Sequence, residues 1–552
     1  MDEQENGGVE NGLMKKILGP HFRLFFLFFA VGAGLTFAIG NSIQFHALSN
    51  DYWNILYYGR RMTLAQPESL YNGFYPFGYA FLIGQMPFTY VLPLSYLLNA
   101  LLAGLLVASV STLVSYARSV PATLVAFYSS IAAPFVFQNA NTLSPDIGAA
   151  AFTAFAVFLL CRDWFDPVPR DLSRNGGTHP LQGQVAAVHD LQTLDARFIL
   201  AGISLGLSFL WRTHAAVSIV AVAVGYILLK GLYPIRPRLW MAASLAAVAG
   251  LQVVINLISG HGAFETGQAF NLYKFFYGVD WTHPPTPADL EDFSLFQTIA
   301  EDPARAFGLY KPFFLYFISH TWAAALAFLL SPKGRYARFS LFSLIFIVLY
   351  AIPISVSDSA RSPVILMSVY LPSAAVLLAA LTDLGKKHIR FSSRWVEWGI
   401  AVLFVAAGFR TFYSWAEYDI GLVRAAHAER KVLSVVEQTL LDNGMISPTE
   451  VFADRYDFYT PNTMPYRSRQ IGNWSAGWVW GYAEEFPALP NDAWEAFASA
   501  CREQGIRFLV LSQNSHYRGE IFPPIYNDEV DLEALGLRFI GQRGKMRLYA
   551  FQ

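Results

Sequence analysis

Long apolar runs recur along this chain of 552 residues, and they limit its fold more than any other feature. The run that begins at His21, HFRLFFLFFAVGAGLTFAIG, reaches the roughly 20 apolar residues that cross a hydrocarbon core about 30 Å thick. Only 14% of the residues are charged, whereas a soluble domain has about 25%. The sequence therefore predicts a polytopic α-helical membrane protein and excludes an ordinary soluble fold.

About eleven candidate spans follow one another along the chain, at residues 22–45, 92–116, 120–138, 145–161, 198–211, 215–229, 239–259, 309–331, 339–355, 362–381 and 395–413. Lysines and arginines gather in every second loop, as the positive-inside rule requires of cytoplasmic loops. We therefore expect a multi-pass membrane protein, and the bacterial inner membrane is its expected location. Its amino terminus would be cytoplasmic and, because the number of spans is odd, its carboxyl terminus extracytoplasmic.

The composition divides the chain into three parts. Residues 1–21 are polar and predict a cytoplasmic disordered tail, and residues 22–423 form the transmembrane domain. Within that domain we expect outer loops at 46–91 and 260–308 and a cytoplasmic loop at 162–197. The short spans on either side of the motif WRTH suggest a shallow hairpin.

After Arg424 the sequence becomes an ordinary soluble mixture. AERKVLSVVEQTLLDNG has helical periodicity with a glycine stop, and TEVFAD, IRFLVLSQ, LRFIGQ and MRLYAF are typical of short strands. A second helix, NDAWEAFASACREQG, has Asn491 available as its N-cap. Residues 424–552 are therefore expected to form a soluble α/β domain on the extracytoplasmic side.

The charge balance argues against nucleic-acid binding, and the positions of the cysteines argue against a disulfide. The formal net charge of -1 argues against a nucleic-acid binder, which needs a basic face to displace counterions from phosphates. Cys161 and Cys501 are the two cysteines, and the predicted topology places them on opposite sides of the membrane. No disulfide is expected between them, and nucleic acid is not an expected partner.

Two acids lie at the predicted outer edge of the spans. Asp51 stands among aromatic residues in SNDYWNILYYGRRM, directly after the first span, and Asp146 opens the fourth span in NTLSPDIG. For the aromatic residues a belt at the membrane interface is the favoured interpretation. A carboxylate near hydrocarbon is costly and serves no anchoring purpose, so Asp51 indicates a functional site. The alternative for Asp146 is an acid that complements the dipole at a helix start.

Several basic groups are expected at the same depth. Arg212 and His214 mark the outer turn between two short spans, Lys274 lies in the long outer loop, and Arg361 precedes the tenth span. Acids and bases that converge on one side of an apolar bundle are typical of a polar reaction centre. The alternative is a scatter of unrelated loop charges.

At these residues the sequence resembles a known family. NDYWNILYYGRRM with SLYNGFYPFGYAFLIG, then NTLSPDIGAAAFTAFAVFLL and LGLSFLWRTHAAV, are similar to the GT-C membrane glycosyltransferases. That superfamily includes the dolichyl-phosphate-mannose-protein mannosyltransferases and the aminoarabinose transferases, which depend on polyprenyl-phosphate sugars. The resemblance implies a bundle of about eleven to thirteen helices with an extracytoplasmic active site, and an enzyme of the glycosyltransferase class.

The resemblance also implies roles for individual residues. Asp51 matches the acid that acts as catalytic base, and Asp146 matches a second acid that organises the acceptor or a divalent cation. Basic residues hold the donor phosphate in the family, and Arg212, Lys274 and Arg361 occupy matching places. Tyr52 and His214 would line the acceptor or sugar site. A second acid beside Asp51 is missing, which leaves the cofactor open between none and a Mg²⁺ or Mn²⁺ ion on Asp51 and Asp146.

The chemistry of such a transfer needs few groups. An acceptor hydroxyl attacks the anomeric carbon, a carboxylate takes its proton, and preorganised cations stabilise the departing phosphate. The sequence leaves the acceptor open among a protein, a glycan and a lipid. The main alternative is a transporter or flippase for a lipid-linked sugar, but such a protein needs polar residues near mid-membrane, where these spans have almost none.

Overall fold

The computed structural model describes the main helices of the membrane bundle and a carboxyl-terminal sheet. Described are residues 18, 20–43, 50–71, 73–87, 90–165, 180–229, 235–265, 267–278, 289–290, 292–333, 336–355, 363–388, scattered positions between 395 and 428, and residues 431–454, 469–470, 489–490, 493–513 and 521–552. Seven helices in these ranges are long and apolar enough to cross a membrane, and the number rises to nine if each of two bent helix pairs forms one span. The predicted polytopic helical fold is confirmed.

The helices follow the predicted spans closely. Six of them contain a complete span: α2 (Phe22–Ile43), α5 (Val91–Ser115), α9 (Pro180–Trp211), α11 (Ile235–Ile258), α17 (Ala337–Ile354) and α18 (Pro363–His388). The seventh span is α8 (Asp146–Cys161) together with the 3-10 turn Arg162–Trp164. The bent pairs, with angles of 45° and 46°, are α6 (Val120–Ala132) with α7 (Pro134–Asn141) and α15 (Pro303–Ser319) with α16 (Trp322–Leu330). Helix α10 (Ala215–Leu228) is apolar but shorter. The predicted span 395–413 falls mostly outside the described residues, so the count of eleven stays a prediction.

Helix α9 corrects one part of the sequence analysis. The span at 198–211, which follows the predicted cytoplasmic loop at 162–197, was expected to be too short to cross alone. Instead, α9 already begins at Pro180, and its segment Leu194–Trp211 is long enough to cross by itself. The predicted shallow hairpin is therefore wrong for its first arm, although the chain does turn at WRTH before α10.

Small and hydroxyl residues bring α8, α9 and α10 together inside the bundle. The Thr153 hydroxyl of α8 lies 3.0 Å from that of Ser208 in α9 and 3.4 Å from that of Ser218 in α10. At Gly148 of α8, a side chain would collide with Trp211, because a Cβ would lie 2.2 Å from its Cδ1 atom. Hydroxyl pairs and close backbone contacts of this kind replace the hydrophobic effect as the source of helix association in lipid.

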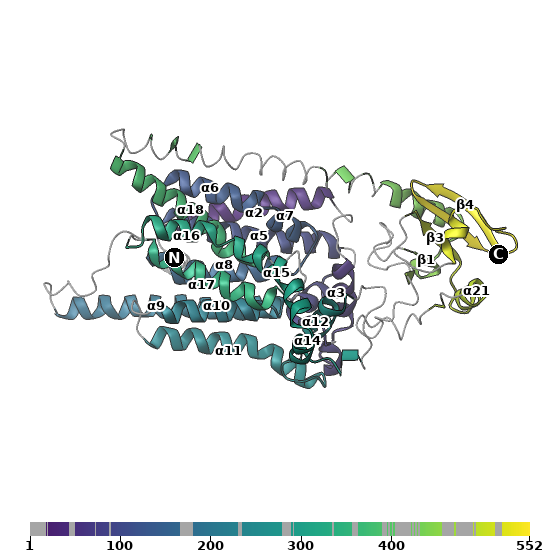
Figure 1. Ribbon diagram of the computed structural model, residues 1–552, viewed down its shortest axis with the longest axis horizontal. Helices are drawn as coiled ribbons and strands as arrows, with labels where there is room; N and C mark the ends of the chain where they lie inside the picture. Colours follow the sequence, from purple (N-terminus) through teal and green to yellow (C-terminus); the bar gives the residue numbers. More distant parts are fainter. Residues whose placement is uncertain are drawn as a thin grey trace, which may run out of the picture.

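Short elements cover one end of the bundle. They are α3 (Asn50–Arg61), the 3-10 turn Pro67–Leu70, α4 (Phe77–Gly84), α12 (Gln268–Tyr277) and α14 (Leu295–Glu301), of which α3, α12 and α14 are labelled at this end in Figure 1. Tyr52 and Tyr58 of α3 are buried rather than placed on the lipid surface. The interpretation of these two aromatic residues as an interfacial belt is therefore wrong. Buried rings fix α3 onto the bundle.

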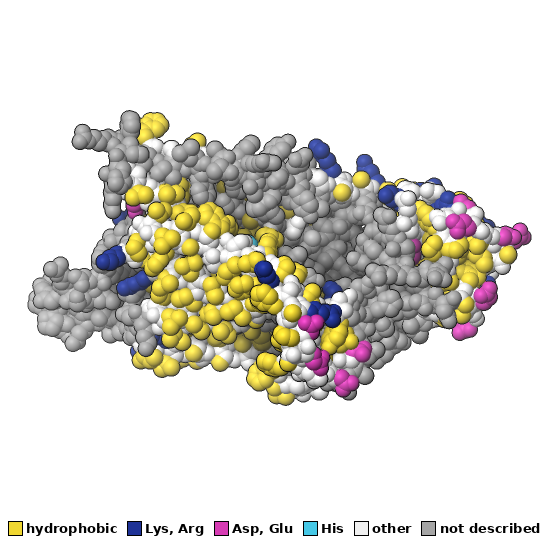
Figure 2. Space-filling model, in the orientation of Figure 1, with side chains coloured by type: hydrophobic (Ala, Val, Ile, Leu, Met, Phe, Trp, Pro, Cys, Tyr) yellow, Lys and Arg dark blue, Asp and Glu magenta, His cyan; other side chains and the backbone are white. Residues whose placement is uncertain are grey.

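The surface of the bundle fits a lipid environment. Figure 2 shows hydrophobic side chains spread broadly over the described middle of this face, with most charged side chains towards the ends. On α11, Leu239, Val254 and Leu257 are each more than half exposed. Exposed large apolar side chains on a spanning helix face acyl chains, so the chain is a multi-pass membrane protein.

The carboxyl-terminal part contains a five-stranded sheet in the order β2-β1-β3-β5-β4. Its strands are β1 (Val451–Ala453), β2 (Arg469–Gln470), β3 (Phe508–Ser512), β4 (Leu537–Arg543) and β5 (Met546–Phe551). Strand β1 is parallel to β2 and β3, whereas β5 is antiparallel to β3 and β4. In Figure 1 the sheet lies beyond the end of the bundle that carries α3, α12 and α14.

Helices cover both faces of this sheet. Val436 and Leu440, from the helix at 431–442, pack with Val451 on one face. On the other face, the Phe497 ring of α21 (Trp494–Glu503) lies 5.1 Å from the Phe452 ring. The predicted α/β composition is confirmed.

Two details of this part differ from the sequence analysis. The N-cap position of α21 is Ala493 and not Asn491, and β2 was not expected. The predicted domain boundary near residue 424 lies where only scattered residues are described, so it stays a prediction.

Candidate active site

Asp146 is the first residue of α8, and its carboxylate is fully buried. The position complements the partial positive charge at a helix start. The Ser144 hydroxyl donates a hydrogen bond of 2.7 Å to Asp146 Oδ2 and also lies 3.2 Å from the Asp146 backbone nitrogen. A buried carboxylate is unfavourable unless it is paired and hydrogen-bonded, so the partners of Asp146 define the site.

Arg212 is the main charged partner of Asp146. Its guanidinium donates from Nε to Oδ1 at 2.8 Å and from Nη2 to Oδ2 at 3.1 Å, in a two-pronged geometry. Such bidentate pairs are stronger and more strictly oriented than single ion pairs. The pair joins the start of α8 to the turn that follows α9, which explains why two residues 66 positions apart meet here.

His214 completes the cluster. Its Nε2 atom lies 3.4 Å from Asp146 Oδ1, and its side chain is 11% exposed. Burial lowers the pKa of His214 to about 4, and the Asp146 carboxylate only partly opposes this shift. The imidazole is therefore neutral at physiological pH and can donate or accept a hydrogen bond without changing the charge of the site.

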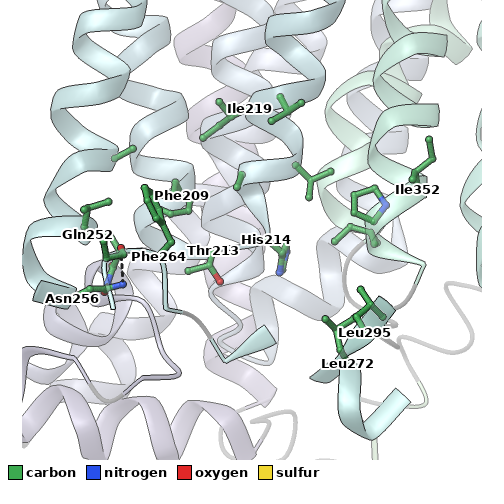
Figure 3. Close-up of a pocket in the computed structure, with 18 of the residues that line it drawn as sticks. Phe209, Thr213, His214, Ile219, Gln252, Asn256, Phe264, Leu272, Leu295 and Ile352 are labelled. Atoms are coloured by element: carbon green, nitrogen blue, oxygen red, sulfur yellow. Dashed lines mark hydrogen bonds between the residues drawn. The ribbon is translucent and has the colours of Figure 1, made fainter. Parts of the chain in front are cut away.

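A large apolar cavity begins at this cluster. Its volume is about 1290 Å³, and it lies between α10, α11, α15 and α17, with α12 and α14 at one end. Thr213 and His214 line it, as do Gln252 and Asn256 from α11, and Figure 3 shows these side chains among aliphatic and aromatic ones. The cavity therefore offers a few polar groups beside a long hydrophobic wall, a combination that suits an amphipathic ligand.

The predicted site residues divide into those that the structure brings together and those that it does not. Asp146, Arg212 and His214 form one cluster. Asp51 is the second residue of α3, but its side chain lies outside the described part of the chain, as does Arg361 entirely. Tyr52 is fully buried, and its hydroxyl lies 3.0 Å from that of Ser95. It therefore packs inside the protein and does not line the described cavity.

Lys274 lies on α12, between two residues that line the cavity. Leu272 and Phe276 contribute to the lining, and Lys274 does not. Residues two positions apart on a helix point to different sides. Its proposed contact with the donor therefore has no support from the described cavity and stays a prediction.

The predicted divalent cation does not fit the described half of its site. Both Asp146 oxygens are engaged by Arg212, and a positive guanidinium in front of a carboxylate competes with a metal ion. In the described ranges, no group of three or more His, Cys, Asp or Glu side chains lies together. We therefore derive no step through a metal.

Sequence reasoning missed the residues that hold Asp146 in place. Ser144 was not singled out, nor was Asn99, which is fully buried in α5 and donates 3.2 Å to the Ser144 carbonyl oxygen. Tyr79 of α4 was missed as well. An asparagine inside an otherwise apolar span was the available signal, because a buried amide needs partners.

Neither the family models nor the curated proteins gave a match to the sequence. The comparison with solved structures gave several matches. The ArnT of Cupriavidus metallidurans matches in its apo state with a TM-score of 0.51 and 12% identity, over 95% of this chain and 97% of that one. The ArnT structure bound to undecaprenyl phosphate matches with a TM-score of 0.50 and 11% identity over the same shares.

The archaeal oligosaccharyltransferase AglB from Archaeoglobus fulgidus, in complex with an inhibitory peptide and a dolichol-phosphate, matches with a TM-score of 0.43 and 14% identity. This match covers 95% of the present chain and 74% of AglB. The two ArnT matches show that this chain shares the fold of ArnT. The resemblance expected from the sequence motifs is thereby confirmed at the level of the fold.

Proposed function

We propose that this protein is an inverting glycosyltransferase that moves a sugar from a polyprenyl-phosphate donor to an acceptor hydroxyl. One observation carries the proposal: the buried cluster of Asp146, Arg212 and His214 reaches, through His214, an apolar cavity of about 1290 Å³ inside a membrane bundle. A donor of this class has an anionic headgroup and a long hydrocarbon tail. The cluster and the cavity match these two parts.

The tail would occupy the cavity between α10, α11, α15 and α17. Its walls are almost entirely aliphatic and aromatic, and a substrate that stays in the bilayer needs such a groove between helices. The phosphate would then lie near the turn that carries Arg212 and His214. A guanidinium stays charged and grips two oxygens at once, which suits it to a phosphate that gains negative charge as it leaves.

Asp51 is proposed as the general base. The acceptor oxygen forms a bond to the anomeric carbon while the bond from that carbon to the phosphate oxygen breaks, and the acceptor proton moves to Asp51. The lipid phosphodiester leaves as a phosphomonoester, and the sugar carbon is inverted. Asp146 would orient Arg212 and the acceptor, and Arg361 and Lys274 are proposed as further contacts to the phosphate.

The reaction is proposed to occur on the extracytoplasmic side of a bacterial inner membrane, with the α/β domain on that same side. The position of the sheet beyond the end that carries α3 supports this arrangement. Aromatic residues of the α/β domain would then be able to contact a protein, glycan or lipid acceptor.

The test is transfer by purified protein in liposomes that contain radiolabelled polyprenyl-phosphate sugars. We expect label to move to an acceptor, and Asp51→Asn to abolish this movement without loss of folded protein. A flippase would instead carry the intact donor across the bilayer and leave the sugar attached. Full transfer by Asp51→Asn would show that the assigned base is wrong.

The cavity has its own test, which compares two substitutions on α11. Ala249 lines the cavity, whereas Leu257 is 56% exposed. We expect Ala249→Trp to raise the KM for a long-tailed donor about tenfold and to affect a short-tailed donor much less. Leu257→Trp, the matched control, should leave both values unchanged. Equal effects on long and short donors would contradict the placement of the tail.

A further inference from the structure

Helix α5 has a small polar face near its N-terminal end. Ser95 and Asn99 are fully buried there, and they stand four residues apart on the same side of the helix. Buried polar groups in a spanning helix are unfavourable unless they have partners. Each of these two residues contacts a different segment of the proposed active site.

Asn99 contacts the turn that precedes Asp146. Its Nδ2 donates to the carbonyl oxygens of Ser144 at 3.2 Å and of Ala140 at 3.4 Å. The Tyr79 hydroxyl of α4 lies 2.9 Å from the Leu143 carbonyl oxygen and 3.2 Å from Asn99 Oδ1. Two buried side chains from separate helices thus hold the backbone of one short turn.

That turn needs to be held, because Leu143 has a left-handed backbone with φ of 54°. A non-glycine residue adopts this conformation at an energetic cost, and such strain persists only where the surroundings enforce it. Ser144 follows directly and donates its hydroxyl proton to Asp146. The conformation of Leu143 therefore sets where the Asp146 carboxylate points.

Ser95 contacts the other segment. Its hydroxyl lies 3.0 Å from that of Tyr52, the residue next to Asp51 in α3. Tyr52 is fully buried, so its ring and hydroxyl fix the rotation of α3 about its axis. The backbone of Asp51 is therefore held through a neighbour that is tied to the same face of α5.

We propose that Ser95 and Asn99 on α5, with Tyr52 and Tyr79, are positioning residues that hold the segments bearing Asp51 and Asp146 in a fixed mutual arrangement. None of the four needs to touch the substrate. The inference rests on the proposed transferase function, and it adds a mechanism by which bundle packing controls the two acids.

The first test separates positioning from folding by kinetics in liposomes. Tyr79→Phe removes one buried hydroxyl, and we expect kcat to fall about tenfold with the donor KM within twofold of wild type. Tyr116→Phe is the matched control, because the Tyr116 hydroxyl donates 2.8 Å to the Leu18 carbonyl oxygen near the other end of α5. It removes the same kind of bond and should leave kcat unchanged.

The second test is rescue through the backbone. Glycine adopts a positive φ without steric cost, so Leu143→Gly should restore most of the kcat that Tyr79→Phe loses. Leu143→Ala creates a similar cavity but keeps a Cβ, and it should not rescue. Melting temperatures of all variants in detergent show whether each one is folded.

The third test concerns the contact between Ser95 and Tyr52, which holds α3. Ser95→Ala should lower kcat about tenfold, whereas Ser109→Ala should not, because the Ser109 hydroxyl bonds only to the Leu105 carbonyl within α5 among the contacts described. Leu143→Gly should fail to rescue Ser95→Ala, since Leu143 lies in the turn before Asp146 and not in the contact that holds α3.

The outcomes distinguish this inference from the proposed function. If wild-type protein transfers no sugar, both the proposed function and the positioning inference are wrong. If wild type is active and Asp146→Asn is not, the function stands. The positioning inference is then overturned by unchanged kcat in Tyr79→Phe and Ser95→Ala, by equal rescue from Leu143→Gly and Leu143→Ala, or by equal losses in the matched controls.

Discussion

The two ends of helix α8 carry similar charges in different surroundings. At its start, Asp146 is fully buried and pairs with Arg212. Just beyond its other end, Asp163 is 39% exposed, and Arg197 donates to it at 2.9 Å. Arg197 also donates to the Leu159 carbonyl oxygen near the end of α8.

The comparison separates anchoring from a functional site. The pair around Asp163 satisfies a helix end, and its carboxylate meets solvent although the Arg197 side chain is buried. In the pair around Asp146 the carboxylate is fully buried and the Arg212 side chain is 18% exposed, so desolvation can cost more than the attraction returns. Its neighbour His214, 3.4 Å from Asp146, lines the cavity, whereas neither Asp163 nor Arg197 does. Burial beside a cavity therefore distinguishes the candidate active site from an ordinary ion pair.

The largest expected effect comes from breaking the buried pair. Asp146→Asn leaves the guanidinium of Arg212 without its carboxylate, and we expect transfer to fall at least a hundredfold. Stability should fall by about 3–5 kcal/mol, as for other broken buried pairs. Initial rates in liposomes and unfolding in detergent measure the two losses.

Asp163→Asn is the control at the other end of α8. The substitution leaves the buried Arg197 guanidinium without this carboxylate, so some stability should be lost. We expect no change in transfer, because neither residue lines the cavity. Equal losses of transfer in Asp146→Asn and Asp163→Asn would mean that the two ends of the helix do not differ in function.

Removing both charges should recover stability without recovering activity. In the double variant Asp146→Asn with Arg212→Gln, no uncompensated charge remains buried. We expect at least half of the stability lost in Asp146→Asn to return, about 2 kcal/mol. Transfer should stay at the level of the single variant. A double variant that regains transfer would show that the pair serves only the fold.

A more conservative change tests the geometry of the pair. Arg212→Lys keeps the positive charge but loses the planar fork, and we expect about a tenfold loss of transfer. Arg197→Lys at the other end should not affect transfer. If Arg212→Lys behaves like wild type in liposome assays, a point charge suffices at this position.

The smallest expected effect is a pH dependence of stability. Because burial lowers the pKa of His214 to about 4, the folded protein binds this proton less readily than the unfolded chain, where histidine titrates near 6.5. Stability should therefore fall as the pH drops from 6.5 towards 4, with Asp146 and Arg212 as the charged groups facing the ring. His214→Gln should reduce this slope in pH-dependent melting curves and leave values above pH 7 unaltered.

The sequence predicted the main helices because spans depend on local composition, and it predicted the cluster of Asp146, Arg212 and His214 because charges at span ends are rare. It misjudged Tyr52, since an aromatic residue near the interface has the same composition whether it faces lipid or protein. It also missed the contact of Tyr79 with Leu143, which are 64 residues apart. Such contacts depend on how helices pack, and no local pattern encodes them.

Helix α10 is 14 residues long, which gives it a length of about 21 Å. That is roughly 9 Å less than the thickness of a typical hydrocarbon layer. Either the bilayer is compressed where it meets this helix, or one end of the helix lies below the level of the lipid headgroups. Where the bilayer is compressed, or where the Arg212 end of the helix is the deeper one, the apolar layer between this turn and the opposite leaflet is thin. Membranes of different thickness should then alter how easily an anionic headgroup reaches the turn.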